Sequence, residues 1–202
     1  MAWGRVVDMA KTQYYTATSI DGFIADENNS LDWLFEQDPG DDNHDRFRTF
    51  MAAVGAIVMG ATTYEWVLDH EHVRSEPAKW REWYGDTPAW VFGHRDLPSI
   101  PGADVRFVAG DVRPVHEAMT EAAGDANIWL VGGGDLVGQF ADHGLLDEII
   151  LGVAPVMLGA GAPLLPRRLS GLRLEGARPS GTMIELRYTV AAEGPAADAE
   201  GA

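Results

Sequence analysis

The sequence of 202 residues lacks cysteine altogether and is poor in cations. Without cysteine it can form no disulfide bond and no thiolate metal site. Its lysines are Lys11 and Lys79, and Lys and Arg together number 15 against 31 Asp and Glu, which gives a formal net charge of −16 at pH 7. This excess of negative charge argues against nucleic acid and anionic membranes as partners. An arginine beside an anion-binding site would therefore be informative.

Long apolar runs are also missing. No stretch approaches the roughly 20 apolar residues that cross a bilayer. The opening residues MAWGRVVDMAKTQ contain no apolar core of a secretory signal. We therefore expect a cytoplasmic protein that does not bind a membrane.

Length and composition predict one globular domain. With 46% hydrophobic and 23% charged residues, the chain can bury a core of ordinary size. Residues 191–202 are small, acidic and aperiodic, which predicts a disordered tail, and residues 1–12 are expected to be loose. Residues 13–190 remain as the domain, without a linker or an internal repeat.

Hydrophobic periodicity predicts strands that alternate with helices along this domain. Expected strands cover 13–19, 55–60, 88–93, 104–109, 127–132 and 146–157, and expected helices cover 41–54, 62–70, 111–123 and 134–144. Residues 20–33 are expected to form a loop, and 71–86 show no clear pattern. The last strands, 172–178 and 182–190, predict a hairpin. The alternation therefore predicts a three-layer α/β fold, a mostly parallel sheet flanked by helices with a C-terminal antiparallel hairpin.

Ligands of such sheets bind beyond the carboxyl ends of the strands. Here those ends are the loop after Ser19 and the turns MGATT, FGHRDLP and VGGGD. Each of the three turns contains glycine, so together the four strand ends could surround one extended, phosphate-bearing ligand.

The glycine run 132–134 allows two interpretations. Glycine permits a tight structural turn between a strand and a helix. It also leaves bare N–H groups at a helix N-terminus, where unpaired donors and the helix dipole favour an anion. The spacing matches neither the G-x-G-x-x-G fingerprint of dinucleotide-binding folds nor a P-loop.

The order of motifs resembles the dihydrofolate-reductase-like family, in the branch related to the C-terminal reductase domain of riboflavin biosynthesis proteins. The matching stretches are TSIDGFIADENNSLDW, IVMGATTYEWV, WVFGHRDLP and, most specifically, IWLVGGGDLVGQFADHGLLDEIILGVAPVMLGAGAPLLP. Together they span residues 13–190. The resemblance implies an NADPH-dependent oxidoreductase that transfers a hydride to a small heterocycle, as dihydrofolate reductase or 5-amino-6-(5-phosphoribosylamino)uracil reductase does.

The resemblance also implies which residues would hold NADPH. On one side of the pyrophosphate it places Val131, Gly132, Gly133, Gly134, Asp135 and Leu136, with a cis peptide between Gly132 and Gly133. On the other side it places Gly60, Thr62 and Thr63, although the threonines could instead cap a helix. Ala17 and Ile24 match positions whose backbone meets the nicotinamide, and core packing is the alternative.

The sequence departs from its relatives at two points. Many relatives carry an arginine directly after the glycine of MG, where it holds the adenosine 2′-phosphate, and here that position is Ala61. His94 and Arg95 are the remaining candidates, because an arginine fork suits a phosphate, unless Arg95 is a plain surface residue. Asp135 stands where folate reductases often have a basic residue, which is unfavourable unless it turns away or caps the helix.

A proton donor is harder to assign. Folate reductases carry a carboxylate on the first helix, and the corresponding residues here are His44 and Asp45, with Asp42 beside them. Such a residue could donate a proton to the substrate, or it could be a solvated helix charge. Asp21 is expected to cap a turn, and Trp33 either covers the active site or packs in the core.

Three functions remain open at this stage. The first is an NADPH-dependent reductase of a small pteridine- or pyrimidine-like molecule, without a metal. The second is a nucleotide-binding sensor or regulator without efficient catalysis, which Ala61 and Asp135 favour. A flavin-dependent reductase is disfavoured because no separate isoalloxazine site is visible. Relatives of the riboflavin type pair as dimers, so we expect a homodimer, with residues 154–166 as its interface.

Overall fold

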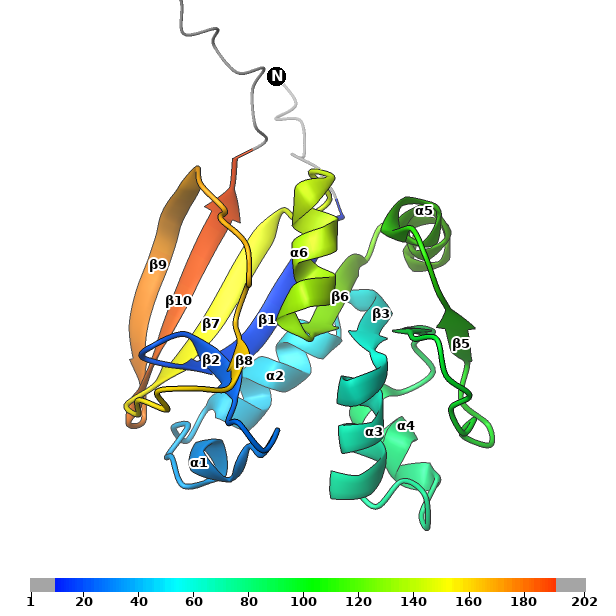
Figure 1. The fold of residues 1–202 in the computed structure, drawn as a ribbon, viewed down its shortest axis with the longest axis horizontal. Coiled ribbons are helices and arrows are strands. Elements are labelled where there is room, and N and C mark those ends of the chain that lie inside the picture. The colour runs from blue at the N-terminus through cyan, green and yellow to red at the C-terminus, as the bar shows by residue number, and fades with distance from the viewer. Residues whose placement is uncertain (1–9, 192–202) are drawn as a thin grey trace, which may run out of the picture.

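The computed structural model describes residues 10–191, so the expected loose N-terminus and disordered tail lie mostly outside the described residues. An eight-stranded sheet runs in the order β5-β4-β3-β6-β1-β7-β10-β9 (Figure 1). Its parallel strands are β1 (Thr12–Ser19), β3 (Val54–Gly60), β4 (Ala89–Phe92), β5 (Val105–Val108), β6 (Asn127–Gly132) and β7 (Glu148–Ala154). The last pair, β9 (Leu172–Ser180) and β10 (Met183–Val190), is an antiparallel hairpin added beside β7. The predicted sheet and hairpin are confirmed.

Helices cover both faces of this sheet. One face packs against α5 (Val112–Ala123) and α6 (Gly134–Asp142), and the other against α2 (Asn43–Met51), α3 (Ala61–His70) and α4 (Ala78–Tyr84). Figure 1 shows α6 lying across β1 and β6. A short α1 (Asp32–Phe35) lies beyond the carboxyl ends of the central strands. Because the central strands are apolar on both faces, helices must cover each face of the sheet, which gives three layers.

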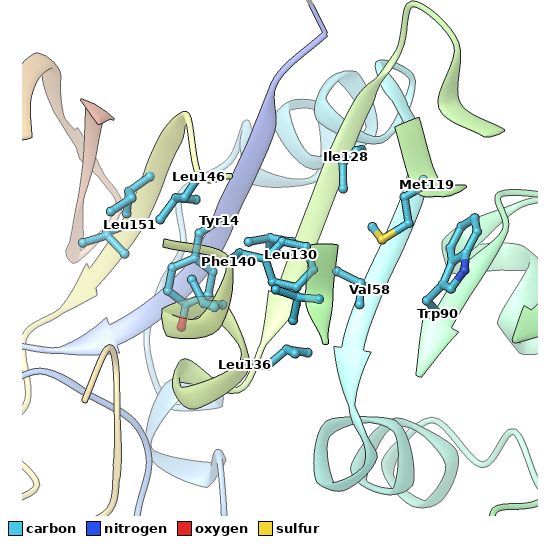
Figure 2. Packing of buried hydrophobic residues seen from close by; sticks show 14 residues of the cluster. Tyr14, Val58, Trp90, Met119, Ile128, Leu130, Leu136, Phe140, Leu146 and Leu151 are labelled. Carbon is cyan, nitrogen blue, oxygen red and sulfur yellow. The ribbon is translucent and has the colours of Figure 1, made fainter. Parts of the chain in front are cut away.

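Strand β3 illustrates why the apolar runs form the centre. Ala56 and Val58 belong to the cluster beneath α5 and α6, whereas Ile57 and Met59 belong to the cluster beneath α3 and α4. All four are completely buried. Successive side chains of a strand point to opposite faces, so a strand buried on both faces must be apolar throughout. Figure 2 shows the first cluster, in which Val58 and Leu130 from neighbouring strands and Leu136 and Phe140 of α6 all contribute.

Two segments differ from the expectation. Residues 71–86, which show no pattern, contain α4, anchored by Trp80 and Tyr84 in the core. The expected loop 20–33 contains β2 (Phe23–Ala25) and the first residues of α1. Strand β2 pairs with β8 (Ala162–Pro163) in a small second sheet, and a pairing between strands so short and so distant leaves no local sequence signal.

Candidate functional site

A cavity of about 910 Å³ follows the carboxyl edge of the sheet. Its wall includes residues that follow β3, β4 and β6, which are strand ends expected to carry the ligand, and residues 15–17 of β1. Ala109 and Gly110, which follow β5, also line it. The volume lies in the upper part of the range of small-molecule and cofactor sites, about 300–1,000 Å³. Residues on its wall that the sequence also singles out are Ala17, Ile24, Gly60, Thr62, Thr63, His94, Val131, Gly132, Gly133, Gly134, Asp135 and Leu136.

The three glycines after β6 do three different things. Gly132 has a φ of +134°, a conformation that side chains rarely allow, and the peptide between Gly132 and Gly133 is cis, as the resemblance implies. A Cβ on Gly134 would lie 2.4 Å from the carbonyl oxygen of Pro163, so Gly134 allows two backbone segments to approach closely. A Cβ on Gly133 would meet no described heavy atom within 4 Å. A Cβ on Gly132 would also meet no described heavy atom within 4 Å, so Gly133 is the one of the three glycines that combines open space with an ordinary backbone conformation, a φ of −75°.

Two helix N-termini open on this cavity. Gly60 is the N-cap of α3 and Gly133 is the N-cap of α6, and no described side chain caps either helix by a hydrogen bond. A Cβ on Gly60 would lie 3.8 Å from the backbone nitrogen of Gly133, so the two turns are neighbours. The first N–H groups of each helix lack helical partners, and both helix dipoles are positive at this end. Together the turns form a site suited to a phosphate group. Thr62 and Thr63 line the cavity rather than cap α3.

Asp135 is turned toward a cation. Its carboxylate accepts hydrogen bonds from Arg167 Nη1 at 2.9 Å and from Gln139 Nε2 at 3.0 Å. The Arg167 hydrogen bond, together with that of Gln139, lowers the pKa of Asp135 below its ordinary value. Arg167 also donates to Asp142 at 2.7 Å. Arg167 thus offsets part of the negative charge of Asp135 and Asp142, which reduces the expected conflict with a phosphate.

The other end of the cavity lies beyond β4 and β5. Its wall contains Gly93, His94 and Gly110. A Cβ on Gly93 would lie 3.0 Å from the Cβ of Ala61, so these two small residues pack together. Arg95 does not line the cavity, because its guanidinium pairs with Glu65 at 2.5 Å and is 56% exposed.

A second part of the wall, which we call the aromatic lobe, lies on the face of the sheet covered by α2, α3 and α4. It is made by Leu31, Leu34, Phe47, Trp66, Tyr84 and Trp129. Phe47 contacts Trp129 edge to face, with ring centroids 5.7 Å apart, and the tilted ring of Tyr84 lies 6.2 Å from that of Trp129. Burial raises the pKa of Tyr84 above its ordinary range, and the nearby Glu71 carboxylate raises it further, so its hydroxyl remains protonated.

Comparison with known proteins shows which family the chain belongs to. The family model of the RibD C-terminal domain matches residues 10–184 of the chain. The chain belongs to the RibD C-terminal domain family. It is 34% identical over 181 residues to the uncharacterized protein YwjB of Bacillus subtilis (strain 168). The aligned region covers 88% of this chain and 97% of that relative.

Solved structures agree with the RibD C-terminal assignment. A putative riboflavin biosynthesis protein from Shewanella sp. PV-4 has a TM-score of 0.72 and 25% identity, covering 89% of this chain and 98% of that one. A dihydrofolate reductase from Enterococcus faecalis, complexed with NADP(H) and RAB-propyl, has a TM-score of 0.54 and 12% identity over 89% of this chain and 94% of that one, a likeness of fold alone. Family and fold support an oxidoreductase of the riboflavin-pathway reductase type.

The candidate proton donors lie off the wall of this RibD-type cavity. His44 and Asp45 belong to α2, but both are exposed, and the residue of α2 that reaches the cavity is Phe47. Asp45 pairs with Arg48 at 2.7 Å and lies beside a smaller cavity of about 490 Å³ between α2 and the sheet. Phe47 and Phe50 face the sheet and contact Tyr15, and Asp45, two positions before Phe47, points elsewhere. His44 precedes Phe47 by three positions, but it lies in the first turn of α2 and is exposed. Neither residue is on the cavity wall, and their role as proton donors stays a prediction.

The structure favours structural roles for two further candidates. Asp21 accepts hydrogen bonds from the Ser19 hydroxyl at 2.6 Å and from the backbone nitrogens of Leu158 and Gly159 at 3.1 and 2.7 Å, so it fastens the turn after β1 to the segment after β7. Trp33 is 8% exposed and donates to the Ser30 carbonyl at 3.2 Å, away from the cavity wall.

The segment predicted as a dimer interface lies partly on the cavity wall. Within residues 154–166, Ala162, Pro163 and Pro166 line the cavity, while Met157 is 70% exposed, and the homodimer stays a prediction.

The sequence alone does not reveal the aromatic lobe, because each of its aromatic side chains resembles an ordinary core residue in its own segment. Trp66 and Trp129 come together with Phe47 only in the folded chain, so no spacing within one segment indicates the lobe.

Two classes of site are not seen in the described part of the chain. No group of three or more His, Asp or Glu within residues 10–191 is placed to hold a metal ion. Over the same range, no helix has the length and apolarity that a membrane crossing requires.

Proposed function

We propose that the protein is an NADPH-dependent reductase that transfers a hydride to a small pteridine- or pyrimidine-like heterocycle. The observation that carries the proposal is the pair of neighbouring helix N-termini, α3 and α6, which open on one cavity without a described side-chain cap. Family membership and the fold shared with an NADP(H)-bound dihydrofolate reductase support it.

The residues present fit the cofactor. Gly133 leaves room for a close approach to the backbone, since a Cβ there would stand in open space at the cavity. Backbone N–H groups at the starts of α3 and α6 would bind the pyrophosphate. Ala17 and Ile24, at the end of β1 and in β2, would hold the nicotinamide, and His94 would lie toward the adenosine. Bound NADPH supplies the hydride that reduces the heterocycle.

The rest of the cavity would hold the molecule to be reduced. The aromatic lobe adjoins Tyr15, Thr16 and Ala17 at the end of β1 on the same wall. Apolar rings would exclude water from the place where the hydride is transferred, which protects the reaction and strengthens the polar contacts around it. The chain's part in the reaction is therefore to orient two flat molecules against each other.

Binding of NADPH to the glycine turn is tested by substituting Gly133. Gly133→Val would place a branched side chain where the backbone must meet the pyrophosphate, so we expect NADPH affinity to fall by more than about tenfold, or about 1.4 kcal/mol. Gly176→Val is the matched control, because Gly176 lies in β9 outside the cavity and a Cβ there also meets no described atom within 4 Å. Titration of cofactor fluorescence measures both. Unchanged affinity in Gly133→Val would refute the assignment.

A nucleotide-binding protein without turnover is the second candidate. It is favoured by the placement of His44 and Asp45 off the cavity wall. Loss of the reduced nicotinamide absorbance in the presence of dihydrofolate or an aminouracil decides between the two. NADPH that binds tightly but is consumed with neither substrate class would support the sensor and contradict the reductase.

A further inference from the structure

The cavity wall holds no cationic side chain. Among the described residues that line it there is neither Lys nor Arg, and its ionisable side chains other than tyrosine are His94 and Asp135. Both follow strands whose ends we assign to the cofactor. The aromatic lobe itself presents only apolar and aromatic side chains, and its one tyrosine hydroxyl stays protonated. The lobe therefore offers no positive charge to a phosphate or a carboxylate.

The segment that closes the lobe is acidic. Residues 31–45, which contribute Leu31 and Leu34 to the wall, contain six acids and no Lys or Arg. These acids are Asp32, Glu36, Asp38, Asp41, Asp42 and Asp45. The first cation that follows, Arg46, is held on the other side of α2 by Asp42, Ser180 and Glu185. The local field at the lobe therefore has the same sign as the net charge of −16 and repels anions.

Cations on the neighbouring helices are already paired. Arg74 binds Asp69 at 2.5 Å, and Lys79 lies 3.7 Å from Glu76. Arg81 of α4 pairs with Asp86. A phosphate in the lobe would have to break one of these pairs or remain without a partner, and an unpaired buried charge is strongly unfavourable.

The ring that borders the lobe on α3 is held in place. The imidazole of His70 lies against both Trp66 and Phe35, with centroids 4.3 and 4.8 Å away and planes within 14° and 7° of parallel, and the Trp66 and Phe35 centroids are themselves 6.3 Å apart. This stack joins α1 to α3 and fixes the indole of Trp66 at the cavity wall. Pre-oriented aromatic rings favour a flat ligand by stacking and edge contacts.

We propose that the aromatic lobe takes a flat heterocycle without phosphate or carboxylate, so that the substrate is a free base or nucleoside-like molecule rather than a phosphoribosyl compound. This departs from the 5-amino-6-(5-phosphoribosylamino)uracil type of substrate that the family resemblance implies. The inference rests on the proposed reductase function for its chemistry, but it concerns binding and can be tested without turnover.

Matched pairs of ligands that differ by one phosphate provide the test. We would measure binding by calorimetry for 5-amino-6-(ribosylamino)uracil against its 5′-phosphate, and for 7,8-dihydroneopterin against its monophosphate, with and without saturating NADPH. We expect the unphosphorylated member of at least one pair to bind about tenfold or more tightly than its partner. Equal or tighter binding of the phosphates, or no binding of any of the four, would overturn the proposal. If the preference holds but NADPH neither binds nor is consumed, the proposed function fails and this inference stands.

A substitution in the lobe should reverse the preference. Leu34→Arg would place a cation at a half-buried position of the wall, and we expect it to shift the ratio of the two affinities toward the phosphate by about tenfold. Leu34→Gln is the control at the same position, since it adds polarity without charge and should leave the ratio unchanged. An equal shift in both variants would mean that charge does not govern selection in the lobe.

Discussion

Gly134 stands against the backbone of residues 163–164 so closely that any side chain would collide with it. A Cβ would lie 2.4 and 2.5 Å from the carbonyl oxygens of Pro163 and Leu164. This contact joins the start of α6 to β8, and through β8 to β2, whose Ile24 lines the cavity. At Gly133 the same added atom would meet open space. Adjacent glycines thus serve packing in one case and access to the cavity in the other.

The two roles separate in stability measurements. Gly134→Ala should lower the free energy of unfolding by about 1–3 kcal/mol, because rigid backbone must move to admit the methyl group. Gly133→Ala should change it by less than about 1 kcal/mol, since nothing is displaced. Urea denaturation of both variants gives the comparison. Equal destabilisation would mean that the turn responds to any side chain and that Gly133 is not special to the cavity.

We expect the preference for NADPH over NADH to depend on Arg95. Its guanidinium is held by Glu65 at the rim, outside the cavity wall, so a 2′-phosphate would have to share it or displace the carboxylate. A charged hydrogen bond of this kind contributes about 1.5–3 kcal/mol. Arg95→Ala should therefore raise the dissociation constant of NADPH about ten- to a hundredfold and leave that of NADH nearly unchanged.

Glu65→Gln provides the complementary measurement for Arg95. Removing the competing carboxylate should tighten NADPH binding or leave it unchanged, without effect on NADH. Parallel titrations of both cofactors against both variants check the pair. If Arg95→Ala weakens NADPH and NADH alike, the residue supports the fold of the rim and does not read the 2′-phosphate.

At the scale of elements, helix N-termini divide into capped and open ones. Helix α5 begins after Asp111, whose carboxylate accepts a hydrogen bond from the backbone nitrogen of Arg113 at 2.9 Å. Helices α3 and α6 begin at glycines and receive no side-chain cap from the described residues. A side-chain cap satisfies an N–H group that a ligand would otherwise use. No described side chain caps α1, α2 or α4 by a hydrogen bond either, so what distinguishes α3 and α6 is that their glycine N-caps both lie on the wall of one cavity.

The cap of α5 should be visible as a dependence of stability on pH. The Arg113 side chain, and then its backbone N–H, lower the pKa of Asp111 to about 2. A carboxyl whose pKa is depressed in the folded state stabilises the fold above its ordinary pKa, and this contribution is lost as the pH falls through the folded value. The Tm of Asp111→Asn should lie below that of the unchanged protein at about pH 6 and converge with it toward about pH 2. Asp125→Asn, at an exposed acid beyond the same helix, is the control, and a constant difference in Tm for Asp111→Asn would contradict the assignment.

Hydrophobic periodicity predicts the helices and strands that bury a regular apolar face in the core, and it misses those that do not. The strand at residues 54–60 and the helix after Gly133 follow from apolar runs and glycine. In helix α4, with the sequence AKWREWY, the buried Trp80 and Tyr84 lie four positions apart on one face, but a helix of 7 residues is too short for this spacing to repeat among its charges. The pairing of β2 with β8 joins segments about 140 residues apart, and nothing within either segment encodes it.

The residues of the candidate site likewise divide into those that the sequence predicts and those that it does not. The rule that ligands bind at the carboxyl ends of parallel strands identifies Gly60, His94 and Gly133 from sequence, because each directly follows a predicted strand. The aromatic lobe depends on how α2, α3 and α4 lie against β6. Phe47, Trp66 and Trp129 meet only through that packing, which residue spacing within one segment cannot show.

For the molecule as a whole, long-range and local electrostatics oppose each other. The chain carries a formal net charge of −16, and no Lys or Arg within residues 10–191 lines the cavity. The attraction available to a pyrophosphate comes from backbone N–H groups at two helix ends, which act over the first turn only. An approaching dinucleotide therefore meets repulsion at a distance and attraction only on contact.

This arrangement predicts that NADPH associates faster as salt is added. Screening shortens the reach of the protein's negative field from about 30 Å at 0.01 M to about 10 Å at 0.1 M ionic strength, whereas the contact with backbone N–H groups is screened less. The association rate, followed by stopped-flow quenching of the tryptophans in the aromatic lobe, should rise by about two- to threefold over this range. The rise should be smaller for NADH, which lacks the 2′-phosphate and its charge of about −1.5 to −2. A rate that falls with salt would show that cations steer the cofactor. In that case Arg95 or Arg167 would have to leave its carboxylate partner before the ligand arrives, and the anion site would be built from side chains rather than from the open ends of α3 and α6.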